Sequence, residues 1–126
     1  MKLIALIFLL TTNSVQAAEF SITMDDFSLS DSTKLSVQQR NESILQTLAK
    51  HKTKAALFVV CKSLQNTIGP KLLSEWSRAG HLIGNHTYSH PRYGTGITYE
   101  AFSDEVARCH DVLKAYTGFQ PFFRFP

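Results

Sequence analysis

Two groups of polar residues, far apart in the sequence, have the types and spacing of a metal site. Asp25 and Asp26 are adjacent, and His86 and His90 lie four residues apart in the stretch GNHTYSH. Side chains four apart on one helical turn have Cβ atoms about 5–6 Å apart, which is close enough to share an ion. One carboxylate and two imidazoles suit a catalytic divalent metal and leave positions open for water and substrate. The second carboxylate is then free to accept a proton from that water.

Each group has a structural alternative when it is taken alone. Aspartates are common in turns and at helix caps, and a histidine pair can equally be part of a surface or a core. The zinc-protease pattern with this histidine spacing needs Glu after the first histidine, where this chain has Thr87, so it argues against that class. Arg124 either pairs with the free carboxylate and orients it or forms an ordinary surface ion pair.

Short apolar runs alternate with longer segments of helical periodicity along the chain. The pattern predicts strands over 20–24, 55–60, 81–85 and 121–126, and helices over 37–51, 70–79 and 99–116, the last two closed by Gly80 and Gly118. Such alternation predicts an α/β fold with parallel strands and right-handed crossovers. Reactive groups in these folds gather at the carboxyl ends of the strands. The aspartates, the histidines and Arg124 each follow or end a predicted strand, so we expect them to meet.

The predicted helix over 99–116 carries an apolar stripe that includes Cys109. The stripe predicts that this cysteine is a buried core thiol, although a disulfide with Cys61 stays open because export would permit one. Trp76 lies on the same helical stripe as other apolar residues and is expected in the core. The remaining histidines, which we expect to be structural or solvated, are His51, His81 and His110.

The first seventeen residues have the order of a secretory signal peptide. Lys2 comes first, an apolar run over 3–10 follows, and small residues precede a cleavage site after Ala17. The alternative is an N-terminal strand or core helix, and the run is too short for a span of roughly 20 residues. The mature chain, 18–126, is therefore expected to be secreted or periplasmic. Its charge, one below the formal +3 once Lys2 is removed, argues for neither nucleic acid nor an anionic membrane as partner.

Three motifs in this order resemble the polysaccharide deacetylase family, the NodB-homology domain of carbohydrate esterase family 4. SITMDD is similar to its first motif, AGHLIGNHTYSHP to its second and FFRFP to the start of its third. The resemblance covers nearly all of 18–126. It implies a distorted, incomplete (β/α) barrel, of which this chain holds about the first four β/α units and is truncated at its C-terminal side.

The resemblance also implies roles for the site residues. Asp25 would be the general base, and Asp26, His86 and His90 would bind a divalent metal, usually zinc in this family. Arg124 would position the base, and Pro126 would help to shape the substrate groove. The implied reaction is hydrolysis of acetyl groups from an N-acetylated or O-acetylated polysaccharide or oligosaccharide, which would be the protein's partner.

The sequence departs from the family pattern in two respects. Phe27 stands where the family usually has Gly after the aspartate pair, and Phe adopts the backbone angles open to Gly only at a cost. The later motifs, including the general-acid histidine, are absent, so we expect the chain alone to be inactive. Two alternatives stay open: a catalytically inactive metal- or glycan-binding remnant, and a same-fold hydrolase of another non-peptide C–N bond. The oligomeric state is not predicted.

Overall fold

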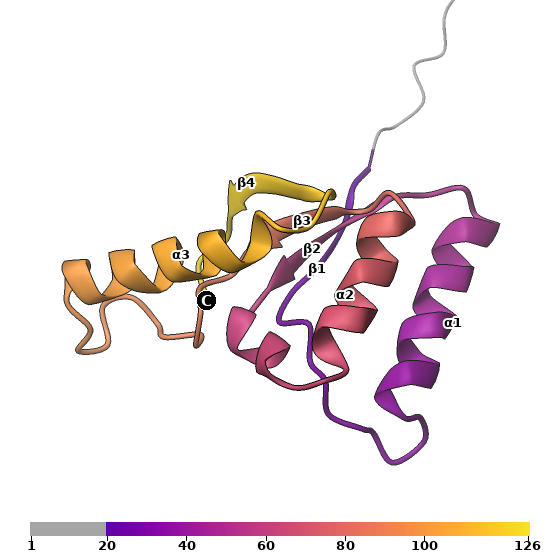
Figure 1. The fold of residues 1–126 in the computed structure, drawn as a ribbon, viewed down its shortest axis with the longest axis horizontal. Helices are drawn as coiled ribbons and strands as arrows, with labels where there is room; N and C mark the ends of the chain where they lie inside the picture. The colour runs from indigo at the N-terminus through magenta and orange to yellow at the C-terminus, as the bar shows by residue number, and fades with distance from the viewer. Residues whose placement is uncertain (1–19) are drawn as a thin grey trace, which may run out of the picture.

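The structure, a computed structural model, describes residues 20–126 as one parallel sheet of four strands in the order β1-β2-β3-β4 with helices in the connections (Figure 1). The elements are β1 (Ile22–Met24), α1 (Val37–Lys50), β2 (Ala55–Val59), the short 3₁₀ helix η1 (Cys61–Gln65), α2 (Gly69–Arg78), β3 (Leu82–Asn85), α3 (Tyr99–Leu113) and β4 (Phe119–Phe123). Each strand pairs in parallel with the next one along the chain. The sheet is not closed, since β1 and β4 are its edges within the described residues. The predicted α/β class and the incomplete barrel of four units are confirmed.

The helices begin where local side chains satisfy their first backbone N–H groups. Ser36 and Gln39 form a capping box at the start of α1, with each side chain accepting from the other residue's N–H. The Thr98 hydroxyl accepts from the Ala101 N–H at the start of α3.

The predicted end of α3 is wrong by about one turn. The helix stops at Leu113, and Gly118 lies at the entrance to β4 instead. A Cβ atom on Gly118 would lie 2.5 Å from the carbonyl oxygen of His81, so glycine is required there for close approach of the chain to β3. The 3₁₀ helix η1 was not predicted, because the apolar run before it gives no sign of a short turn.

The core lies between the sheet and its helices. Val59, Leu72 and Ile83 are fully buried, and Trp76 is buried beside them, which confirms its predicted role as a core residue. The indole N–H of Trp76 donates to the Asn41 side chain at 2.7 Å, so α1 and α2 are joined by a buried hydrogen bond as well as by packing. In Figure 1 these two helices run side by side along the sheet.

Cys61 and Cys109 form a disulfide with their Cα atoms 5.4 Å apart. The prediction of a free core thiol at Cys109 is therefore wrong. The helical stripe did place this residue in the core, but the start of η1 brings Cys61 to the same point, and both cysteines are buried. The bond ties the segment after β2 to the inner face of α3, across 48 residues of sequence.

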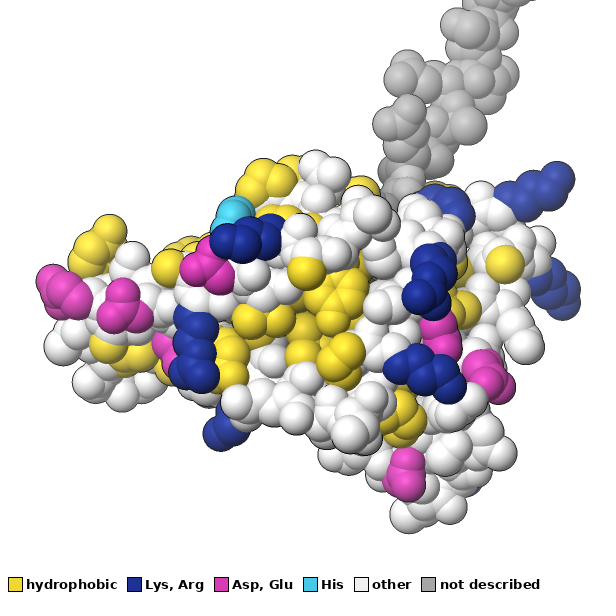
Figure 2. Space-filling view, in the orientation of Figure 1, with side chains coloured by type: hydrophobic (Ala, Val, Ile, Leu, Met, Phe, Trp, Pro, Cys, Tyr) yellow, Lys and Arg dark blue, Asp and Glu magenta, His cyan; other side chains and the backbone are white. Residues whose placement is uncertain are grey.

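The surface carries both signs of charge. On the face in Figure 2, Lys and Arg side chains are interspersed with Asp and Glu, so this face of the described residues has no continuous basic field of the kind that attracts nucleic acid. No helix in residues 20–126 has the length and apolar character needed to cross a membrane. The predicted signal peptide, 1–17, lies outside the described residues.

Candidate metal centre

The predicted site residues meet at the carboxyl edge of the sheet. The aspartate pair directly follows β1, the first histidine follows β3, and Arg124 follows β4. Parallel pairing of neighbouring strands brings these three chain segments to one edge, although they are separated by up to 99 residues. The sheet topology thus assembles the group that the sequence could only place at separate strand ends.

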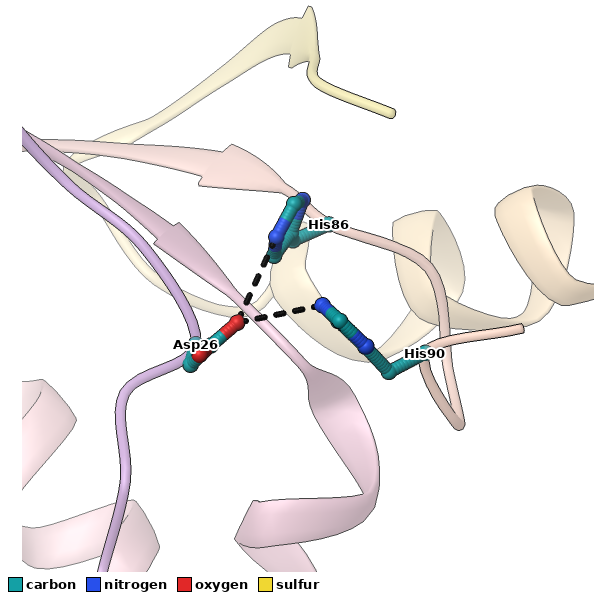
Figure 3. A group of neighbouring side chains, drawn as sticks. All are labelled: Asp26, His86 and His90. Carbon is teal, nitrogen blue, oxygen red and sulfur yellow. Dashed lines mark ion pairs between the residues drawn. The ribbon is translucent and has the colours of Figure 1, made fainter. Parts of the chain in front are cut away.

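Asp26, His86 and His90 converge on a common point (Figure 3). Oδ1 of Asp26 lies 3.4 Å from Nε2 of His86 and 3.2 Å from Nε2 of His90. One ligand atom from each residue lies within 4.8 Å of the others. The side chains of His86, His90 and Asp26 are 4%, 38% and 58% exposed, so the group is buried on one side and open on the other. This arrangement can hold an ion and still admit water and substrate.

The ring of His86 is oriented for metal binding by its second nitrogen. Nδ1 lies 2.9 Å from the backbone carbonyl oxygen of Arg124. A carbonyl can only accept, so Nδ1 carries the hydrogen and Nε2 presents its lone pair toward Asp26. Metal-ligating histidines in proteins are commonly fixed by such an outer hydrogen bond. The donor set of one carboxylate and two imidazoles, with this tautomer, fits a divalent metal.

Asp25 is paired with Arg124 and does not belong to the group formed by Asp26, His86 and His90. Nη1 of Arg124 donates to Oδ1 of Asp25 at 2.7 Å and to the Thr23 hydroxyl at 3.1 Å. The guanidinium also lies over the Phe58 ring, 4.1 Å from its centroid. The arginine is thus fixed from three directions, and Asp25 lies beside the ligand group with one oxygen already paired.

The backbone at this edge is strained. Asp26, Phe27, Thr87 and His90 have φ values of 71°, 54°, 68° and 67°. Such angles are uncommon in residues other than glycine, and they cluster at functional sites. The sequence predicted the cost at Phe27, and the structure shows what opposes it: the Phe27 ring is buried in the core cluster. Burial of the aromatic ring offsets the energetic cost of a backbone angle that glycine would adopt freely.

A hydrogen-bonded turn carries the two histidines. The Asn85 side chain accepts from the Thr87 N–H at 2.9 Å and donates to the carbonyl of Val106 on α3. The buried Thr87 hydroxyl in turn accepts from the His90 N–H at 3.1 Å. These supporting roles of Asn85 and Thr87 were not predicted from the sequence. The only signal was the position of two polar residues beside the histidines, which does not show what each would bond.

An open groove adjoins the ligand group. It has a volume of about 450 Å³, and polar and apolar surface contribute about equally to its lining, which is formed by Asp26, Ser28, Leu29, Ser30, Val60, Ser63, Asn66 and His90. Hydroxyl and amide groups of this kind can hydrogen-bond a polar ligand in either direction. Asp26 and His90 therefore face a space that a hydroxylated molecule could occupy.

Comparison with known proteins gives one family and several relatives. The family model described as polysaccharide deacetylase matches residues 12–126. A peptidoglycan-N-acetylglucosamine deacetylase of Bacillus cereus is 29% identical over 83 residues, which is 66% of this chain and 29% of that protein. The chain thus spans less than a third of that relative's length.

Two solved structures show the same fold. The structure of the Bc1960 peptidoglycan N-acetylglucosamine deacetylase has a TM-score of 0.68 at 27% identity and covers 84% of this chain and 45% of its own. A family 4 acetyl xylan esterase from Clostridium thermocellum, in complex with a cobalt ion, has a TM-score of 0.65 at 25% identity and covers 82% and 46%.

Proposed function

The chain belongs to the polysaccharide deacetylase family, and on that premise we propose that it supplies the metal-binding and proton-accepting half of a hydrolase that removes acetyl groups from a carbohydrate. The observation that carries the proposal is the division of the aspartate pair. Asp26 faces His86 and His90, while its neighbour Asp25 is paired with Arg124. This division supports a role for Asp26 as a ligand and for Asp25 as a base.

Asp26, His86 and His90 would hold the metal. We propose Zn²⁺, because two imidazole nitrogens and a carboxylate oxygen are a common catalytic set for that ion. A bound ion of this kind polarises an acyl oxygen and lowers the pKa of its water. The cobalt ion in the related acetyl xylan esterase supports the assignment of a divalent metal in general.

Asp25 would act as the general base. The contact with Arg124 uses Oδ1, which leaves Oδ2 to take the proton from water as that water attacks the acetyl carbon. Arg124 would act as a positioning residue, because its own bond to Thr23 and its stacking on Phe58 fix the direction of the carboxylate. A base held in this way need not be reoriented when substrate binds.

The substrate would be an N-acetylated or O-acetylated glycan, and peptidoglycan is the leading candidate because two relatives are named for it. The serine hydroxyls and the Asn66 amide that line the groove beside Asp26 and His90 support a hydroxylated ligand. Pro126, half-buried and two residues after Arg124, would contribute to one wall. A cell-wall substrate agrees with secretion or periplasmic export through the signal peptide at 1–17, with the mature domain at 18–126.

One alternative is favoured by a specific observation. The other histidines of the chain lie away from this centre: His51 caps α1, His81 is buried before β3, and His110 packs on Phe119. In residues 20–126, Asp25 is therefore the proton-transfer group that we assign. A metal- or glycan-binding protein without turnover is the second candidate.

The test is acetate release from chitin oligomers and from peptidoglycan by the product of the complete coding sequence, with and without Asp25→Asn. We expect zinc content to be unchanged and the rate to fall by about 10²–10⁴, the usual contribution of a general base. Equal rates for both proteins would remove Asp25 from the mechanism. Stoichiometric zinc with no acetate from the unmodified protein would establish the binding alternative, and activity only on other amides would identify a different C–N hydrolase.

A further inference from the structure

The two histidine ligands are held in different ways. The ring of His86 is buried and fixed through Nδ1 by a backbone carbonyl. The ring of His90 is 38% exposed, and within residues 20–126 its only polar ring contact is with Asp26. Its backbone has φ 67° and is bonded to the Thr87 hydroxyl. The position of His90 therefore depends on what fixes the backbone of the turn.

A carboxylate from α3 binds the residue directly before His90. Glu105 accepts two hydrogen bonds from Ser89: from the backbone N–H to Oε2 at 2.5 Å and from the hydroxyl to Oε1 at 2.9 Å. Both oxygens of the carboxylate are thus used on one residue. Hydrogen bonds to an ionised acceptor are short and about twice as strong as neutral ones, and the paired geometry restricts rotation of the Ser89 peptide.

The helix that carries Glu105 is itself firmly attached to the turn. Cys109 lies four residues further on the same helix, so the two side chains share one face. Its disulfide partner, Cys61, donates its backbone N–H to the carbonyl of Thr87 at 3.2 Å. The Arg108 guanidinium also lies 3.5 Å from the centroid of the Tyr88 ring. Glu105 therefore acts from a support that cannot easily move relative to the histidines.

We propose that Glu105 is a positioning residue for the metal ligand His90, acting through Ser89. The inference rests on the proposed metal site and extends it to a residue outside the three family motifs. Without the carboxylate, the Ser89 peptide is free to rotate, and the left-handed backbone of His90 can relax toward commoner angles. Nε2 of His90 then leaves the point that it shares with Asp26 and His86.

The experiment compares Glu105→Ala, Glu105→Gln and the control Asp104→Asn, which removes an exposed carboxylate one residue earlier on the same helix. Zinc affinity is measured by competition with a chromophoric chelator, and the metal-free proteins are compared by thermal unfolding. We expect Glu105→Ala to weaken zinc binding about tenfold, within the range for outer partners of metal ligands. Glu105→Gln should lose less, because its carbonyl oxygen can still accept one of the two bonds. Asp104→Asn should match the unmodified chain.

Two spectroscopic measurements separate positioning from general destabilisation. The visible spectrum of the Co²⁺ form should change in Glu105→Ala and not in Asp104→Asn, because it reports ligand geometry. The backbone amide resonances of Ser89 and His90 in the metal-free chain should shift in Glu105→Ala alone. Unchanged zinc affinity together with an unchanged cobalt spectrum would overturn the proposal while leaving the metal site intact. If the proposed metal site itself is wrong, the unmodified chain would bind no zinc, and this result differs from the one that overturns the role of Glu105 alone.

Discussion

The strand β3 connects two buried histidines that use the same ring nitrogen in opposite ways. His81, just before the strand, accepts at Nδ1 from the Ala55 N–H at 3.2 Å. His86, just after it, donates from Nδ1 to the Arg124 carbonyl at 2.9 Å. Both residues are 3% exposed, so burial does not distinguish them. Their tautomers do, because His81 carries its hydrogen on Nε2 and His86 keeps Nε2 free for an ion.

Residues with left-handed backbone angles also occupy different positions near His81 and near His86. Left-handed residues near His81 are Lys52 and Gly80, which follow the ends of α1 and α2 and serve as ordinary helix stops. Left-handed residues near His86 include the proposed ligands Asp26 and His90. One end of the sheet uses such angles to turn the chain, and the other uses them to aim side chains. We therefore interpret the edge of the sheet at His81 as structural and propose the edge at His86 as the functional one.

The largest expected difference between the His86 end and the His81 end of the sheet is in metal binding. His86→Ala or His90→Ala should abolish stoichiometric zinc binding, a loss beyond the about 10–100-fold that outer partners contribute. His81→Gln, the matched change at the other end, should leave zinc content unchanged. Elemental analysis of the purified chains measures this directly. Full zinc content in both ligand variants would remove the distinction between the ends.

The disulfide should stabilise the His86 end more than the His81 end. A bond between residues 48 apart contributes about 4 kcal/mol in the chain-entropy model, so Cys61→Ala with Cys109→Ala should lower the free energy of unfolding by roughly 2–4 kcal/mol. Chemical denaturation measures the total. Hydrogen exchange locates it: the Cys61 amide bonded to Thr87 should lose more protection than the Ala55 amide bonded to His81. Equal losses at both amides would contradict a local effect.

Much of this architecture was predictable because it depends on local patterns. The apolar run over 55–60 predicted a strand, and parallel strands predicted the edge at which the aspartates and histidines meet. The energetic cost of the backbone angles at Phe27 was also predicted. The disulfide was not, because a buried cysteine on a helical stripe satisfies the same pattern whether or not a second cysteine reaches it.

The finer features of the site could not be read from local patterns. The tautomer of His86 is set by Arg124, which is 38 residues away, and the support of Ser89 comes from Glu105, 16 residues away. Hydrogen bonds of this kind depend on the distances between elements after packing. Residue type gives the capacity to bond, and only the assembled sheet and helix give the partner.

Backbone strain at the ligand end can be tested at Phe27. Both Phe27→Ala and Phe27→Gly lose the buried ring, at about 3–5 kcal/mol for the alanine variant. The glycine variant should be the more stable of the two by about 1 kcal/mol, because the φ of 54° costs alanine that much. At the other end, in the extended strand, Ala55→Gly should instead destabilise by roughly 0.5–1 kcal/mol. Denaturant titration gives all three values, and a less stable Phe27→Gly would argue against strain.

The smallest expected effect is a pH dependence at the His81 end. Burial, with a smaller contribution from the Lys54 charge, lowers the pKa of His81 below its ordinary 6.5. The unfolded chain therefore binds a proton more readily than the folded chain. The stabilisation is complete above pH 6.5 and is lost as the pH falls from there toward the lowered folded value. Protonation of Nδ1 also forfeits the bond from Ala55, on the order of 1 kcal/mol.

The measurement is the free energy of unfolding of the metal-free chain between pH 7.5 and 5, compared with His81→Gln. Glutamine can accept from Ala55 but does not titrate, so this variant should lose less stability in acid than the unmodified chain. Identical pH profiles would show that His81 does not contribute.

The contact between Arg124 and Asp25 also has a consequence for the order in which the molecule forms during synthesis. The bond joins residues 99 apart in the sequence, so it can form only after the whole segment from Asp25 to Arg124 has left the ribosome. The three proposed ligands are all synthesised before β4. Until that strand docks, His86 lacks the carbonyl that fixes its tautomer and Asp25 lacks its cation. On the proposed assignment, the three ligands would be present before the base is aligned, and docking of β4 would be the step that orients both His86 and Asp25.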